Sequence, residues 1–250
     1  MNTETTDQKL EATIDAALAD TFPASDPPPW TLGREPRPTA PMMTGASPPQ
    51  TEARPEVTRK EEKSRLTILG IAGSLRRASY NHALLRAAQQ LVPTNVTLDI
   101  FDIAGIPLFN QDNEKTLPTE VVEFKTRIRA ADTILIATPE YNYSIPGVLK
   151  NAIDWASRPP DDNAWNGKPV AVLGASIGRL GTARAQYHLR QVFVTLNMCA
   201  LNQPEVMISN ADKLFDATGN LTDTETQVRL QRLLDQLVLW ARQLQRNTPK

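Results

Sequence analysis

Short apolar segments alternate with amphipathic ones from about residue 65 to the end of the chain. Three of the apolar segments carry almost no polar side chain, which is typical of strands buried on both faces of a sheet. A fourth alternates between apolar and polar residues, and a fifth strand is expected a little after residue 200. The predicted strands are Leu66–Ala72, Val96–Phe101, Thr133–Ala137, Val170–Gly174 and a segment within Ala200–Ile208.

The segments between the strands have the periodicity of helices with one apolar face. The last of them is expected to begin with a capping box, in which Thr222 and Glu225 satisfy free backbone N–H groups. Strands that alternate with helices predict an α/β fold, a parallel sheet covered on both faces in a three-layer sandwich. The predicted helices are Asn81–Val92, a helix opened by Pro118, Pro146–Trp155, Thr182–Asn197 and the segment from Thr222 to Leu244.

The first 64 residues differ from the rest of the chain. Ten of the 20 prolines fall between Pro23 and Pro55. Proline fixes φ and donates no hydrogen bond, so neither a helix nor a sheet runs through such a segment. We therefore predict a disordered N-terminal extension over residues 1–64, with one short helix near residues 7–20, and a single domain over residues 65–250.

Composition excludes several classes of protein. The net charge of the chain is −1, which gives no field that attracts nucleic acid or an anionic membrane. Cys199 is the only cysteine, so neither an intrachain disulfide nor a multi-cysteine metal site is expected. No secretory signal or membrane-length apolar run is recognisable, so a cytoplasmic protein without membrane insertion is expected.

Ligands of open parallel sheets bind where the carboxyl ends of the strands meet their loops. The loop after the first strand, residues 73–81, reads GSLRRASYN and is called the first loop. Its hydroxyls, its two arginines and the backbone N–H groups of a helix N-terminus suit a phosphate. The loop is neither a Walker A loop nor a G-x-G-x-x-G fingerprint. Taken alone, it fits an ordinary serine-capped turn equally well.

Two more loops follow buried strands. The second loop, residues 138–147, reads TPEYNYSIPG, and its prolines make it rigid while its tyrosines offer faces to a planar ligand. A proline-braced structural turn is the alternative. The third loop, residues 175–181, reads ASIGRLG, and its glycines permit a ligand to approach the backbone closely.

These loops, in this order, resemble those of the NADPH-dependent FMN reductase family, and of its quinone- and chromate-reducing branch in particular. The resemblance rests on GSLR with SYN in the first loop, on PEYNYSIPGVLKNAIDW from Pro139, and on ARAQYHLRQ from Ala183. It covers roughly Leu66 to Leu244. It implies a flavodoxin-like fold, with a five-stranded parallel sheet in the order 2-1-3-4-5. Relatives often have a smaller residue at the position of Arg179, which leaves the pocket shape and the acceptor preference open.

The resemblance also implies an FMN site. Its phosphate end is expected at the first loop, and its isoalloxazine between the second and third loops, with the backbone of Glu140 mattering more than its carboxylate. The cofactor-binding residues implied in the first loop are Ser74, Leu75, Arg76, Ser79, Tyr80 and Asn81. Those implied in the other two loops are Pro139, Glu140, Tyr141, Asn142, Tyr143, Ser176 and Gly178. No catalytic side chain and no metal ligand is predicted.

The implied activity is a ping-pong cycle, in which NADPH or NADH reduces FMN and a small-molecule acceptor such as a quinone or chromate then takes the electrons. The alternatives are a reductase of free FMN, a flavodoxin-type electron carrier and a non-catalytic sensor with the N-terminal region as its output. Residues 65–250 hold 17 acidic and 20 basic side chains, and this slight positive charge disfavours the usually acidic carriers. Family members are typically homodimers or homotetramers, and Arg184 and Tyr187 lie on a helix expected to serve that assembly.

Overall fold

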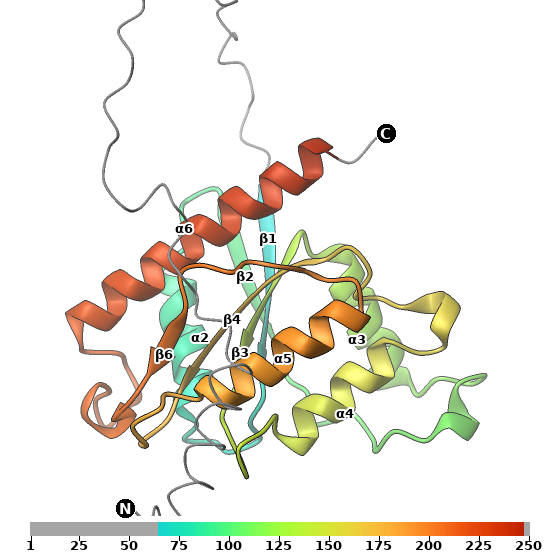
Figure 1. The fold of residues 1–250 in the computed structure, drawn as a ribbon, viewed down its shortest axis with the longest axis horizontal. Coiled ribbons are helices and arrows are strands. Elements are labelled where there is room, and N and C mark those ends of the chain that lie inside the picture. The colour runs from blue at the N-terminus through green and yellow to red at the C-terminus, as the bar shows by residue number, and fades with distance from the viewer. Residues whose placement is uncertain (1–64, 248–250) are drawn as a thin grey trace, which may run out of the picture. The chain divides into compact units, whose positions relative to one another are not determined.

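The computed structural model describes residues 65–247, drawn in colour in Figure 1. The predicted N-terminal extension and its short helix near residues 7–20 lie outside the described residues. No helix in the described range is both long enough and apolar enough to cross a membrane.

The described residues build one parallel sheet in the order β2-β1-β3-β4-β5. This is the predicted order. Its central strands are buried because each has helices on both faces, which explains their nearly continuous apolar sequences. The strands are β1 (Leu66–Ala72), β2 (Val96–Phe101), β3 (Thr133–Ala137), β4 (Pro169–Ala175), β5 (Cys199–Ala200) and β6 (Val206–Ile208).

The fifth position of the sheet is shared by two short strands. β5 pairs with the beginning of β4, where Pro169 lies opposite Cys199. β6 pairs with the end of β4, where Ala175 lies opposite Ile208. The chain between them leaves the sheet and passes through a cis bond before Pro204. The predicted fifth strand is therefore present in two pieces.

Two layers of helices cover the sheet (Figure 1). Helices α2 and α6 pack on one face around Ile68 and Leu84, and α3, α4 and α5 pack on the other around Leu69 and Phe124. Neighbouring residues of β1 thus serve opposite cores, as the pleat of a strand requires. The helices are α2 (Tyr80–Leu91), α3 (Thr119–Ala130), α4 (Gly147–Ala156), α5 (Ala183–Thr195) and α6 (Thr224–Asn247), with short 3₁₀ turns at Gln111–Asn113, Pro160–Asp162 and Ala211–Lys213.

The beginning of α6 differs from the prediction. Asp223, rather than Thr222, caps the helix, and its Oδ2 accepts a hydrogen bond of 2.8 Å from the N–H of Thr226. Hydrogen bonds from Thr226 lower the pKa of Asp223. The hydroxyl of Thr222 instead donates to the carbonyl of Leu214. The predicted capping box is wrong because Thr222 is bound to the preceding loop and an equally good N-cap residue follows it.

Candidate active site at the carboxyl edge of the sheet

The three loops meet at one edge of the sheet, because β1, β3 and β4 are adjacent and parallel. β2 and β3 flank β1 on opposite sides, so the strand order reverses there, at the point where ligands of such sheets bind. The first loop is joined to β3 by a 2.8 Å hydrogen bond from Gly73 N to Ala137 O. It is joined to the end of β4 by the Asn81 side chain, whose Oδ1 accepts from Ala175 N and whose Nδ2 donates to Ala175 O.

Hydrogen bonds within the first loop fix its path into α2. Ser79 is the N-cap of the helix, and its Oγ accepts from the N–H groups of Asn81 and His82. The ring Nε2 of His82 lies 2.7 Å from the carbonyl oxygen of Ser74. The hydroxyl of Ser74 accepts a 3.3 Å hydrogen bond from Arg76 N. The polar side chains of the loop are thus already oriented around the N-terminus of α2.

Several donors of the first loop remain available to a ligand. The backbone N–H groups of Leu75, Arg77 and Ala78 make no hydrogen bond to another described residue. The guanidinium groups of Arg76 and Arg77 are exposed and form no ion pair within residues 65–247. Arg76 lies over the ring of Tyr80, 5.5 Å from its centroid. Free N–H groups in the turn that leads into a helix, together with two unpaired cations, suit an anion.

The second loop contains a tight hairpin turn. Tyr141 and Ser144 exchange backbone hydrogen bonds of 3.2 and 2.9 Å. The two residues between them, Asn142 and Tyr143, have φ values of +48° and +64°. Such a turn reverses the chain sharply. Asparagine adopts positive φ readily, whereas a bulky tyrosine does so only where its surroundings hold it there.

Helix α5 supplies those surroundings. The guanidinium carbon of Arg184 lies 3.5 Å from the centroid of the Tyr143 ring, a stacked cation–π contact. One turn further along, His188 Nδ1 lies 2.9 Å from the hydroxyl of Ser144. Tyr143 as a whole is nevertheless 67% exposed. The helix therefore holds the turn in place and leaves one side of the tyrosine ring to a ligand.

Glu140 links the second loop to α5 through its carboxylate. The carboxylate is 8% exposed and forms an ion pair with Arg184. It also accepts hydrogen bonds of 3.1 and 3.3 Å from the N–H groups of Arg184 and Ala185. Glu140 thus caps α5 in place of the N-cap residue Thr182, which has a φ of +70° and makes no capping bond with its side chain. This carboxylate is therefore part of the scaffold that joins the second loop to α5.

Burial lowers the pKa of Arg184, but its hydrogen bonds and its attraction to Glu140 outweigh that effect, and the pKa is raised overall. The Arg184 side chain is therefore cationic at neutral pH.

Replacing Glu140 by Gln should lower the free energy of unfolding by about 1 kcal/mol, because the amide keeps one acceptor for the α5 N–H groups but loses the attraction to the half-exposed Arg184. Urea unfolding of the flavin-free protein measures this. The matched control is Glu123→Gln, on the exposed face of α3, which should leave the stability unchanged. Equal stability of the two variants would show that the Glu140–Arg184 pair does not brace the loop.

A hollow of about 280 Å³ lies between the second and third loops. Five of the residues implied by the resemblance line it, namely Glu140, Asn142, Tyr143, Ser176 and Gly178. Arg179 and Arg184 line it as well. The resemblance bears on Arg179 only through the shape of the pocket, and it implies a role in assembly for Arg184. Ser176 Oγ accepts a 3.0 Å hydrogen bond from Gly178 N, which shapes the wall of the third loop.

The other implied residues lie around this hollow. Pro139 lies against Gly73, and the exposed Tyr141 begins the hairpin turn. Tyr80 stacks on Phe215, with ring centroids 5.4 Å apart. Leu75 lines a separate hollow of about 640 Å³, mostly apolar, between the first loop, the chain after β2 and α4.

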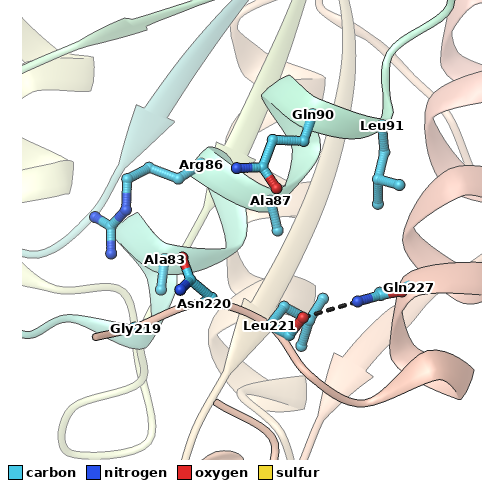
Figure 2. A pocket seen from close by; sticks show the side chains of 9 residues that line it. All are labelled: Ala83, Arg86, Ala87, Gln90, Leu91, Gly219, Asn220, Leu221 and Gln227. Atoms are coloured by element: carbon cyan, nitrogen blue, oxygen red, sulfur yellow. Dashed lines mark hydrogen bonds between the residues drawn. The ribbon is translucent and has the colours of Figure 1, made fainter. Parts of the chain in front are cut away.

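A third hollow, of about 310 Å³, lies away from these loops, between α2 and the segment that precedes α6. Figure 2 shows Arg86 and Gln90 on α2, facing Asn220 and Gln227 across it. None of the residues implied by the resemblance lines this hollow. Residues 65–247 also hold no cluster of three or more His, Cys, Asp or Glu residues placed to bind a metal ion.

Comparison with known proteins identifies the family. The model of the NADPH-dependent FMN reductase family matches residues 66–213, more than half of the chain. An NAD(P)H-dependent FMN reductase from Pseudomonas aeruginosa is 56% identical over 180 residues, which cover 72% of this chain and 97% of that protein. The chain belongs to the NADPH-dependent FMN reductase family. It is therefore an oxidoreductase with FMN as its cofactor and NAD(P)H as its electron donor.

Further relatives of the chain agree with its placement in this family. A 2-hydroxy-1,4-benzoquinone reductase from Burkholderia sp is 46% identical and covers 71% of this chain and 97% of that protein. Among solved structures, the flavoenzyme FerB, an NAD(P)H:(acceptor) oxidoreductase from Paracoccus denitrificans, matches with a TM-score of 0.67 and 38% identity, covering 71% of this chain and 98% of that chain.

The residues of this reductase fit FMN. The free N–H groups and unpaired arginines of the first loop suit the dianionic phosphate. The hollow between the second and third loops has an aromatic face at Tyr143 and glycine backbone at Gly178, which suits a flat ring system. The Asn81 amide makes both of its hydrogen bonds to Ala175, so the structure uses this side chain to hold two loops together.

Arg184 is the site residue that sequence reasoning assigned to another role. In the structure it pairs with Glu140 and stacks on Tyr143, and its role in assembly stays a prediction. A signal for this role is present in the sequence, since Glu140 follows β3 and Arg184, of opposite charge, stands in the first turn of the helix that follows the adjacent strand β4. The sequence alone did not show that the Glu140 side chain turns toward α5.

Proposed function

We propose that this FMN reductase reduces quinones with electrons from NAD(P)H. The observation that carries the proposal is the convergence of an anion-binding loop with an aromatic-walled hollow at the point where the strand order reverses. The names of the relatives support the acceptor class, since the Burkholderia protein is a 2-hydroxy-1,4-benzoquinone reductase. A protein from Pseudomonas putida, 42% identical, is a quinone reductase.

FMN, when bound, supplies the redox chemistry, because it takes a hydride from NAD(P)H and gives two electrons to the acceptor. We assign the binding of its phosphate to the first loop, through Ser74, Arg76 and the free N–H groups of the turn before α2. We assign the placement of its ring system to the hairpin turn of the second loop and to Ser176 and Gly178. Glu140, Arg184 and His188 keep the hairpin turn in the geometry that this placement needs.

Each turnover converts one NAD(P)H, one quinone and one proton into NAD(P)⁺ and a hydroquinone. The hollow opens to solvent at the exposed Tyr143, so water can supply the protons without a protein acid. Donor and acceptor both need contact with the same flavin ring, so we expect them to bind in turn. Chromate is a second possible acceptor, which would bind after NAD(P)⁺ has left, as the quinone does.

Steady-state kinetics test the proposal. Full-length protein loaded with FMN should oxidise NADPH or NADH on addition of 1,4-benzoquinone, without a partner protein. The flavin should stay with the protein through gel filtration. Dependence on a second reductase would identify an electron carrier instead, and release of the flavin on reduction would identify a reductase of free FMN.

A homodimer or homotetramer is part of the proposal, because apolar side chains are exposed on two faces of the domain. Leu108 is 85% exposed beside the 640 Å³ hollow, and Val194 on α5 is 81% exposed. Light scattering measures the oligomeric state, and a monomer at micromolar concentration would refute this part of the proposal.

A cytoplasmic location also belongs to the proposal, since NAD(P)H is available there, and fractionation of cells tests it.

A further inference from the structure

Arg179 stands out among the charged residues of the hollow between the second and third loops. Three charged side chains line this hollow, Glu140, Arg179 and Arg184. Glu140 and Arg184 neutralise each other in an ion pair, and Arg184 is also stacked on Tyr143. Arg179 is exposed and forms no ion pair with any residue from 65 to 247. The hollow therefore carries one uncompensated positive charge.

The neighbours of Arg179 are apolar. Leu180 also lines the hollow and is 52% exposed, and Ile177, two residues before Arg179, is 66% exposed, so the third loop exposes hydrocarbon near Arg179. The hydroxyl of Ser176 fixes the start of this segment through its hydrogen bond from Gly178 N. A guanidinium pairs with a carboxylate or an enolate through two parallel hydrogen bonds, whereas apolar side chains favour an uncharged ring. The combination suits a planar apolar molecule with an anionic substituent on one edge.

We propose that Arg179 selects acceptors, so that quinones with an anionic substituent are preferred to neutral quinones of the same size. This rests on the proposed quinone reductase function. Hydroxyquinones belong to the favoured class, because loss of their acidic proton leaves an enolate whose charge is shared with a ring carbonyl. Since Arg179 is exposed, its contribution is moderate and falls as salt screens the charges.

The first test compares two acceptors in three proteins. Wild type, Arg179→Ala and Arg179→Lys are assayed with 2-hydroxy-1,4-naphthoquinone, an anion at neutral pH, and with its neutral 2-methoxy analogue. Each acceptor is compared with itself across the proteins, so intrinsic reactivity cancels. We expect Arg179→Ala to lower the ratio of kcat/KM for the anionic to the neutral acceptor about fivefold, with the lysine variant between the two. The difference should shrink at high salt.

The charge-matched control is Arg86→Ala, which removes an exposed arginine from the separate hollow beside α2 (Figure 2). It should leave the acceptor ratio at the wild-type value. Equal loss for both acceptors in Arg179→Ala, or no loss at all, would overturn the proposal. So would a change in the preference for NADPH over NADH with an unchanged acceptor ratio, because Arg179 would then serve the phosphate of the dinucleotide.

A second readout does not depend on turnover. Benzoate and benzamide have nearly the same shape and differ in charge, and their binding to the oxidised holoprotein is followed by the change in flavin absorbance. Arg179→Ala should weaken benzoate about fivefold and benzamide hardly at all. Equal affinities of benzoate for wild type and variant would contradict the role of Arg179. A wild-type protein without quinone turnover would refute the proposed function, and the benzoate titration would still decide on Arg179.

Discussion

Gly174→Ala should lower the free energy of unfolding by about 3 kcal/mol or more, the largest effect that we expect from a single methyl group in this protein. A Cβ atom at residue 174 would lie 1.9 Å from Oγ1 of Thr182 and 2.4 Å from the carbonyl oxygen of Thr138. Thr182 is 1% exposed, and its Oγ1 accepts a hydrogen bond from Gln186, so it has little room to move. Relief of the clash requires movement of the backbone where β3 and β4 enter the second and third loops.

Urea unfolding of the flavin-free protein, followed by tryptophan fluorescence, measures this loss without a contribution from bound ligand. The control is Gly147→Ala at the start of α4, where a Cβ atom would meet no neighbour within 4 Å. Alanine favours the helix there, so the control should be as stable as wild type or slightly more stable. A Gly174→Ala protein within 1 kcal/mol of wild type would contradict the close packing of Thr182 and Gly174.

Arg76→Ala should weaken the binding of FMN about tenfold, which corresponds to about 1.4 kcal/mol. The reason is the loss of a charge-assisted contact to the phosphate at the N-terminus of α2, where Arg76 makes no ion pair with another described residue. Fluorescence titration of the flavin-free protein with FMN gives the affinity.

Riboflavin, which lacks the phosphate, should bind wild type and Arg76→Ala equally. Arg86→Ala serves as the protein control and should bind FMN as wild type does. The assignment of Arg76 to the phosphate would be wrong if its removal weakened riboflavin and FMN by the same factor, since the residue would then contact the ring system or support the fold.

The strands and helices could be predicted from the sequence because each depends on the pattern of apolar residues within its own segment. Leu66–Ala72 and Thr133–Ala137 are apolar on both faces, and the helices between the strands repeat their apolar residues every three to four positions. The resemblance added the strand order. Parallel topology alone then places the three loops at the carboxyl edge of the sheet. In the structure, Gly73 joins the first loop to the end of β3, and Asn81 joins it to the start of the third loop.

Features that depend on contacts between different segments of the chain could not be predicted from the sequence. Thr222 has the sequence context of an N-cap, but its hydroxyl is bound to Leu214, and Asp223 takes its place. Glu140 and Arg184 are 44 residues apart, and the ion pair between them depends on the adjacency of β3 and β4. No periodicity in the sequence predicts such an ion pair. The pair nevertheless matters for the site, because its Arg184 stacks on Tyr143.

The central claim is that three strand-end loops form one site with a phosphate end and a ring end. Titration of the flavin-free full-length protein with FMN and with riboflavin tests it most directly. We expect one FMN bound per chain, and riboflavin bound about tenfold more weakly or worse, because the first loop then has no anion to hold. Equal affinity for the two flavins, or no binding of either, would contradict it.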